Sequence, residues 1–165
     1  MANFAALTLI YPKPNLIRPI TSEDLDLLRI WKNDNKDAFF SRQVITFNEQ
    51  LKWYCAYLDR DNDYMFAVLS PTGSIAGCMG VRFISHQKYW DVYNVILGDL
   101  RFKGSGLMSK ALLELIEFAK QKDDLPIKLV VLSNNPAVGW YEKNGFTSES
   151  ENSTSIIMCY DRKNL

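Results

Sequence analysis

The sequence predicts an α/β fold with a mixed, mostly antiparallel central sheet of about six to seven strands, flanked by about four helices. Three observations predict it. Two helix-start signals precede the main strands, three consecutive strand-like segments between residues 64 and 97 have no helix between them, and a long amphipathic helix separates these from a further apolar strand. A doubly wound sheet needs strands and helices in regular alternation, so this order excludes one.

The composition is that of a folded protein, and we expect a single domain over residues 1–165. Hydrophobic residues make up 47% and charged residues 23% of the chain, as in globular proteins and unlike disordered ones. Nineteen Lys and Arg balance nineteen Asp and Glu, so no diffuse basic field exists to hold a nucleic acid. We therefore expect a small-molecule partner, no nucleic acid or membrane partner, and either a monomer or a homodimer.

The cysteines and the N-terminal stretch predict a cytoplasmic protein without a metal site. Cys55, Cys78 and Cys159 form no CxxC pair and leave an odd thiol, so neither a disulfide framework nor a cysteine-based zinc site is supported. The apolar stretch 2–10 follows no Lys or Arg and is cut off by Pro12, well short of the roughly 20 residues of a membrane span. We interpret it as a strand.

Two helices are expected before the main sheet, after a short strand over residues 16–20. Pro19 confines that strand to an edge or an end, because proline cannot donate a backbone hydrogen bond. Capping-box patterns open the two helices at Thr21-x-x-Asp24 and Thr46-x-x-Glu49. The apolar residues that fall on one face of the second helix are Phe47, Leu51, Tyr54, Cys55 and Leu58.

Three strands follow at residues 64–69, 74–84 and 90–97, the first two joined by a Ser-Pro-Thr-Gly turn. A long helix over about 106–121 carries a stripe of apolar residues that predicts one buried face. The next strand, 126–132, is almost continuously apolar, as expected of a central strand covered on both faces.

A short helix and a hairpin complete the chain. The helix is expected over 135–144, with Asn135 as its N-cap and Pro136 as its first helical residue. The hairpin pairs residues 146–149 with 154–160.

A glycine-containing loop lies between the strand at 90–97 and the long helix. Its residues are Arg101, Phe102, Lys103, Gly104, Ser105 and Gly106. Glycines allow close backbone approach, and the amides and dipole of a helix start attract phosphate oxygens. Neither the P-loop nor the dinucleotide-binding glycine pattern fits the spacing. A ligand-free helix start would also explain two glycines.

A second motif occupies the short helix. Asn134-x-x-Ala137-x-x-x-Tyr141-x-x-x-Gly145-Phe146 places a small residue and a phenol four positions apart, on one helix face. The small side chain leaves room for a ligand to pass beside the tyrosine hydroxyl. Taken alone, the motif is also explained by a tyrosine that packs in the core.

Together the two motifs resemble those of the GNAT superfamily of acetyl-CoA-dependent N-acetyltransferases. The family's pyrophosphate loop reads Gln or Arg, two variable residues, Gly, one variable residue, then Gly or Ala, and residues 101–106 match it fully. The later motif matches at every fixed position, and the likeness extends over about Ile17–Tyr160. Two weaker patterns, Arg29-x-Trp31-Lys32-Asn33 and Ile45-Thr46-x-x-x-Gln50-x-x-Trp53, look like the subgroup that acetylates amino sugars on nucleotide carriers or protein N-terminal amines.

The resemblance implies a sheet splayed between its fourth and fifth strands, acetyl-CoA as co-substrate, and direct acetyl transfer to a primary amine within a ternary complex. The pyrophosphate would lie on the amides of loop 101–106. The other cofactor-binding residues it implies are Ile96, Leu97, Asn134 and Ala137. Tyr141 would protonate the departing thiolate, because a phenol stays protonated at neutral pH.

On the acceptor side, the glutamate that the family often uses as base in the strand at 90–97 is missing, and Asp91 is that strand's only carboxylate. Asp91, Tyr93 or a water molecule would therefore take the proton from the amine. The acceptor-binding residues would be Trp31, Asn33, Trp90 and Tyr93. The structural alternatives are a solvated Asp91 and a Trp31 that fills the gap between helix and sheet. The functional alternative is a non-catalytic acetyl-CoA-binding module.

Overall fold

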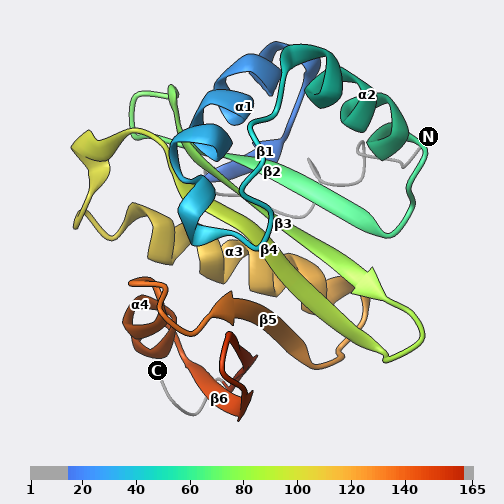
Figure 1. Cartoon of the computed structure of the whole chain (residues 1–165), viewed down its shortest axis with the longest axis vertical. Helices are drawn as coiled ribbons and strands as arrows, with labels where there is room; N and C mark the ends of the chain where they lie inside the picture. The colour runs from blue at the N-terminus through green and yellow to red at the C-terminus, as the bar shows by residue number, and fades with distance from the viewer. Residues whose placement is uncertain (1–14, 162–165) are drawn as a thin grey trace.

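The computed structural model describes residues 15–161, which form one seven-stranded sheet with helices on both faces (Figure 1). The strands are β1 (Ile17–Pro19), β2 (Asp63–Leu69), β3 (Ile75–Ile84), β4 (Tyr89–Leu97), β5 (Ile127–Leu132), β6 (Phe146–Glu151) and β7 (Ser155–Tyr160). The helices are α1 (Leu25–Asp34), α2 (Phe47–Leu58), α3 (Leu107–Lys122) and α4 (Val138–Lys143). The strand expected over residues 2–10 lies outside the described residues.

The sheet has the order β1-β2-β3-β4-β5-β7-β6, and every neighbouring pair is antiparallel except β4 and β5. The parallel ladder between these two contains only the pairs Trp90–Ile127 and Asp91–Lys128. Beyond them both strands continue without pairing to each other. The predicted mixed sheet and its opening between the fourth and fifth strands are thus confirmed.

Side-chain alternation along the strands divides the apolar interior into two clusters, one on each face of the sheet. Phe66 and Met79 belong to the cluster that packs on α3, while Met65 and Cys78, their neighbours in the chain, belong to the cluster with α1 and α2. α1 and α2 lie together on one side of the sheet (Figure 1). The two helices therefore face the side of β4 that carries Asn94 and Ile96.

Both helix-start predictions are confirmed by the capping hydrogen bonds. The Thr46 side chain accepts from the Glu49 amide at 3.3 Å, and the Thr46 amide donates to the Glu49 carboxylate at 2.8 Å. Thr21 and Asp24 make the equivalent box, but a short 3-10 turn (Ser22–Asp24) precedes α1. The Asp24 carboxylate also receives two hydrogen bonds from Arg18, which joins β1 to this helix start.

The structure corrects the predicted face of α2. Phe47, Leu51 and Leu58 are exposed, and the face turned to the sheet carries Gln50 and Tyr57 instead. The cause is tertiary, because the Tyr57 hydroxyl accepts a hydrogen bond from the backbone amide of Met65 in β2 at 3.0 Å. The sheet therefore holds α2 by a polar contact that amphipathic periodicity does not reveal.

Two further expectations are corrected near the opening of the sheet. β5 is not covered on both faces, since Val130 is 43% exposed where the strand leaves β4. α4 starts at Val138 with Ala137 as its N-cap, not at Pro136. Asn135 still organises this start, because its side-chain oxygen accepts from the Ala137 amide at 2.8 Å.

Candidate functional site

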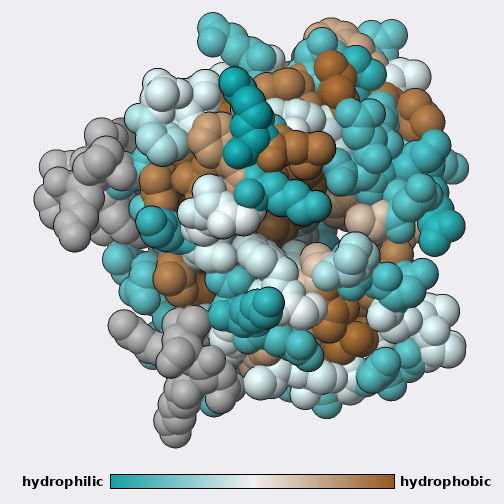
Figure 2. Space-filling view, turned by 90° about the vertical axis from the view of Figure 1, so that its left-hand side faces the viewer, coloured by the Kyte–Doolittle hydropathy of each residue, from teal (hydrophilic) through white to brown (hydrophobic). Residues whose placement is uncertain are grey.

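A cleft of about 870 Å³ lies where β4 and β5 separate. Its walls come from β4 between Asp91 and Leu97, from β5, from the segment 38–41 after α1, and from the start of α4. Figure 2 shows the side of the molecule on which the glycine loop and α4 lie, where apolar surface gathers around a hollow among hydrophilic side chains. The cleft is large enough for an extended organic ligand, because ligand sites span about 300–1,000 Å³.

Within residues 15–161, the β4 edge of the cleft has backbone groups without a strand partner. Beyond Asp91, β4 pairs with β3 on one side only, and unpaired strand edges readily accept an added strand. Ile96 and Leu97 lie on this part of β4 and line the cleft. Their predicted pairing with the amides of an extended ligand is therefore sterically open.

A bulge in β4 bends this edge. Between Tyr93 and Ile96 the strand takes one more residue than β3 does between Gly80 and Cys78, and Asn94 has a positive φ of 49°. Such a conformation is uncommon outside glycine but is tolerated by asparagine. Bulges re-aim side chains and backbone next to functional sites, and this one lies in the middle of the cleft wall.

Tyr141 lies in the opposite wall, on α4. It is 9% exposed and lines the cleft together with Ala137, one turn earlier in the helix. Its hydroxyl has no hydrogen-bond partner within residues 15–161. Burial raises the pKa of Tyr141, so the phenol remains a proton donor throughout the neutral range.

The glycine loop reaches the cleft through Lys103, while Gly104 and Gly106 do not line it. Gly104 and Gly106 both have positive φ, near 76° and 77°, and a Cβ on either would meet nothing within 4 Å. The backbone conformation alone therefore accounts for both glycines. Lys103 reaches the cleft, whereas the Arg101 guanidinium is held by Asp99 at 2.7 Å. The Ser105 amide already donates to the Phe102 carbonyl, which leaves the amides of Gly104 and Gly106 for a ligand.

Asp91 is buried at the base of the cleft and not solvated. Its carboxylate accepts from Arg82 Nε at 2.9 Å and lies 2.8 Å from Arg82 Nη2. Burial raises the pKa of Asp91, the neighbouring Asp63 carboxylate adds to this, and Arg82 opposes it. Tyr93 lines the same wall and donates a short hydrogen bond to Asp63. The two carboxylates are buried, their arginines are partly exposed, and Tyr93 lies between the two ion pairs.

The acceptor-binding residues expected from the sequence are only partly brought together. Tyr93 lines the cleft, but Trp31 and Trp90 are buried outside it. Trp31 packs on Gly98, where a Cβ would overlap the indole, and Trp90 donates to the Asp123 carbonyl. The structural alternative for Trp31 therefore describes its position, and the acceptor assignment of both tryptophans is not supported by this packing.

Two predicted asparagines also lie away from the cleft. The Asn33 side chain donates to the carbonyl of Ile45 and accepts from its amide, which joins the end of α1 to the segment before α2. Asn134 is exposed and does not line the cleft, whereas Asn135 does and donates to the Ala38 carbonyl at 3.1 Å. Asn135 thus connects the two walls, a role that its cap-like position did not reveal.

Sequence reasoning gave Asn94 and Gln50 no role of their own, and it offered Lys32 only as one of several candidates to contact phosphate or hydroxyl groups of the acceptor. Lys32 Nζ lies 2.5 Å from the Asn94 side-chain oxygen and 3.0 Å from the centre of the Phe39 ring. Gln50 is buried on the side of α2 that faces the sheet, and it lines a small cavity together with Lys32 and Asn94. The available signal was the Trp-Lys-Asn and Gln-x-x-Trp patterns at 31–33 and 50–53, which do not show that their polar side chains meet.

Within the described residues, no three His, Cys, Asp or Glu side chains are grouped so that they could hold a metal ion. None of the helices in this part of the chain is long and apolar enough to span a membrane.

The mixed sheet that opens at a parallel strand pair, followed by a glycine loop and a long helix, defines an acetyltransferase fold. Residues 27–146 match the profile of the acetyltransferase (GNAT) family. Because the match spans well over half of the sequence, the chain belongs to the GNAT family. No curated protein sequence matches it at a significant level.

Solved structures share this fold over nearly the whole chain. The apo form of FdhC, described as a nucleotide-linked sugar GNAT, has a TM-score of 0.75 at 18% identity and covers 90% of this chain and 86% of its own. Spermidine N-acetyltransferase from Vibrio cholerae, with CoA and spermine, has a TM-score of 0.76 at 18% identity and covers 90% and 95%. The PaiA N-acetyltransferase from Thermoplasma acidophilum, with coenzyme A, has a TM-score of 0.70 at 18% identity and covers 88% and 97%.

Proposed function

We propose that the protein transfers the acetyl group of acetyl-CoA directly to the primary amine of a small polar acceptor. The amine nitrogen attacks the thioester carbonyl, a C–N bond forms, the C–S bond breaks, and CoA leaves as a thiolate that takes up a proton. The observation that carries the proposal is the cleft itself. It is lined by an unpaired strand edge, by Lys103 of the glycine loop, and by a buried phenol that has no hydrogen-bond partner within residues 15–161.

The donor would be held along β4 and at the start of α3. The pantetheine amides would pair with the backbone near Ile96 and Leu97, and the pyrophosphate would lie on the amides of Gly104 and Gly106 at the positive end of the helix dipole. Lys103 adds a positive charge there. Unlike Arg101, which pairs with Asp99, it forms no ion pair within residues 15–161. Holding two reactants in register replaces several kcal/mol of association entropy.

Tyr141 would donate a proton to the thiolate. Its pKa is raised by burial, so the proton is present at neutral pH, and no other group of the described part of the chain engages the hydroxyl. A donor that meets charge only as it develops stabilises the transition state more than the bound substrates.

Asp91 is the proposed acceptor of the amine proton, directly or through a water molecule. Tyr93 is less suited, because burial and the Asp63 charge raise its pKa strongly and its hydroxyl proton is already donated to Asp63. Burial also raises the pKa of Asp91, which brings this carboxyl closer to neutral pH than a solvated one.

For the acceptor we propose an amino sugar carried on a nucleotide, supported by the fold shared with the nucleotide-linked sugar GNAT and by Phe39, Phe40 and Lys32, which line the cleft. Aromatic faces stack on flat rings, and an ammonium binds phosphate or hydroxyl oxygens. One domain would carry both substrates in the cytoplasm, as a monomer or a homodimer, with no nucleic-acid or membrane partner.

Acetyl-CoA binding is tested by calorimetry on Gly104→Asp, with Gly104→Ala as the matched control. Both variants strain the same positive φ, but only the aspartate adds a charge that repels phosphate. We expect Gly104→Asp to lose binding and Gly104→Ala to retain most of it. If wild type and Gly104→Asp bind acetyl-CoA with equal affinity, the pyrophosphate does not bind at this loop.

Transfer is tested by thiol release with nucleotide-linked amino sugars, aminoglycosides, polyamines and N-terminal peptides. We expect turnover of an amino sugar, and a loss of about tenfold to thousandfold in kcat for Tyr141→Phe with acetyl-CoA affinity retained. Selective turnover of peptides would show that the acceptor is a protein N-terminal amine and not an amino sugar. Acetyl-CoA binding without turnover of any amine would show a non-catalytic module.

A further inference from the structure

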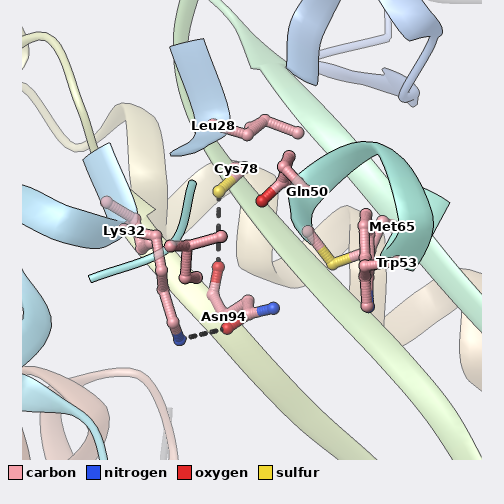
Figure 3. A pocket seen from close by; sticks show the side chains of 9 residues that line it. Leu28, Lys32, Gln50, Trp53, Met65, Cys78 and Asn94 are labelled. Atoms are coloured by element: carbon pink, nitrogen blue, oxygen red, sulfur yellow. Dashed lines mark hydrogen bonds between the residues drawn. The ribbon is translucent and has the colours of Figure 1, made fainter. Parts of the chain in front are cut away.

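A second, smaller space opens from the cleft, and we call it the inner cavity. It has a volume of about 240 Å³ and lies between α1, α2 and the face of the sheet (Figure 3). Lys32, Trp53, Asn94 and Ile96 line both the cleft and the inner cavity. Apolar side chains that form most of its wall are Leu28, Ile45, Trp53, Met65 and Ile96.

Gln50 projects from α2 into this apolar space (Figure 3). It is 8% exposed, and its side-chain amide has no hydrogen-bond partner within residues 15–161. A buried amide that lacks partners is costly, since it has given up its bonds to water. The two donors and the acceptor of Gln50 are therefore available to a ligand.

Lys32 reaches the same cavity from α1. One of its N–H donors is taken by the Asn94 side-chain oxygen, and Phe39 covers it. No carboxylate lies within ion-pair distance of Lys32 in the described part of the chain. Burial lowers the pKa of Lys32 to about 8, so at pH 7 the side chain is still mostly an unpaired cation.

The remaining polar groups of the inner cavity are uncharged, so they do not offset the positive charge of Lys32. Burial raises the pKa of the Cys78 thiol to about 12, which keeps it neutral, and its Sγ donates to the Asn94 carbonyl at 3.5 Å. The cavity thus offers hydrogen-bond donors and one positive charge on an apolar wall. It lies against the bulge at Asn94, which stands in β4 between Asp91 and the edge at Ile96 and Leu97 that is proposed to hold the pantetheine.

We propose that the inner cavity recognises the acceptor next to its amine, with Gln50 and Lys32 donating to an oxygen on a compact carbon frame, and that Lys32 excludes acceptors bearing a second ammonium group. This inference rests on the proposed function. It predicts that polyamines are poor substrates, in contrast to the Vibrio cholerae enzyme of the same fold that is described as a spermidine N-acetyltransferase. Like charges in a partly desolvated site repel strongly.

The test uses trans-2-aminocyclohexanol and cyclohexylamine, which differ by one oxygen beside the amine, together with spermidine. The variants are Lys32→Gln and Gln50→Met, with Lys52→Gln as control because Lys52 is an exposed lysine of α2. In the wild type we expect kcat/KM for the amino alcohol to exceed that for cyclohexylamine and for spermidine by at least about tenfold. The control variant should keep both ratios.

Gln50→Met should reduce the preference for the amino alcohol about tenfold, whereas Lys32→Gln should also raise kcat/KM for spermidine about tenfold. Acetyl-CoA affinity and melting temperature, measured on each variant, show whether it is folded. The proposal is overturned if the wild type acetylates spermidine as well as the amino alcohol, or if Lys32→Gln leaves their ratio unchanged.

A binding measurement separates this proposal from the proposed function. Calorimetry measures amine binding to the protein saturated with CoA. If no amine is acetylated but the amino alcohol binds the wild type and not Gln50→Met, the inner cavity recognises the acceptor and the proposed transfer reaction is rejected. If neither amine binds the wild type, the inner cavity has no recognition role.

Discussion

Lys32, in the last turn of α1, has no carboxylate partner among the described residues, and its replacement should change how stability depends on pH. Burial lowers the pKa of Lys32 from 10.5 to about 8. Between these values the unfolded chain binds more protons than the folded one, so the free energy of unfolding rises with pH in this window. A lowering of this size corresponds to about 3 kcal/mol, which we expect Lys32 to cost the fold at pH 7 and below.

Lys32→Met keeps the length of the side chain and removes the charge. We expect the variant to be more stable than wild type at pH 7 by about 1–3 kcal/mol, since the lost hydrogen bond to Asn94 offsets part of the gain. The advantage should shrink steadily from pH 8 to pH 10.5. Urea unfolding followed by circular dichroism at half-unit pH steps measures both slopes.

Lys52→Met serves as the control, because Lys52 is exposed on α2 and should give a pH-independent difference. The reasoning is refuted if the stability difference between Lys32→Met and wild type is constant across pH 7–10.5. It would then follow that the Phe39 ring and Asn94 stabilise the ammonium as well as water does.

Two smaller changes test the packing that positions the cleft. Gly98→Ala adds a methyl group that overlaps the Trp31 indole, so we expect a loss of about 1–3 kcal/mol in urea unfolding, and an unchanged midpoint would show that Trp31 moves freely. Thr46→Ala removes the oxygen that accepts from the Glu49 amide and should cost about 1 kcal/mol, whereas Thr46→Ser should cost little, and equal losses for both would contradict the cap.

The helix starts and the order of helices and strands along the chain could be predicted because their signals are local. A capping box needs four consecutive residues, and Thr46 with Glu49 forms it in the structure. The glycine loop and the Ala137–Tyr141 spacing are local in the same sense. The buried face of α2 was not predictable, since it depends on a hydrogen bond between Tyr57 and β2 that no helical period encodes.

The acceptor side was the hardest to predict for the same physical reason. Trp31 has polar neighbours in the sequence, but the bare backbone of Gly98, 67 positions later, offers the surface on which it packs. Lys32 and Gln50 come from different helices and line one cavity only because both helices pack on the sheet. Long-range contacts of this kind leave no pattern in a single sequence.

Arg82 decides whether Asp91 can act as a base, because it is the cation that faces this buried carboxylate. Burial and the nearby Asp63 raise the pKa of Asp91, and Arg82 lowers it. Arg82→Met removes the lowering contribution, so the pKa of Asp91 must rise. If Asp91 takes the amine proton, the acidic limb of the kcat/KM profile will move to higher pH, since a base must be ionised to act.

The matched control for this change is Arg60→Met. Arg60 pairs with Asp63 at 2.7 Å but does not contact Asp91. Both variants lose a half-buried ion pair and some stability, yet only Arg82→Met should shift the acidic limb. If the acidic limbs of wild type, Arg82→Met and Arg60→Met coincide, Asp91 is not the base and only stabilises the pairing of β3 with β4. A water molecule in the cleft would then be the immediate proton acceptor.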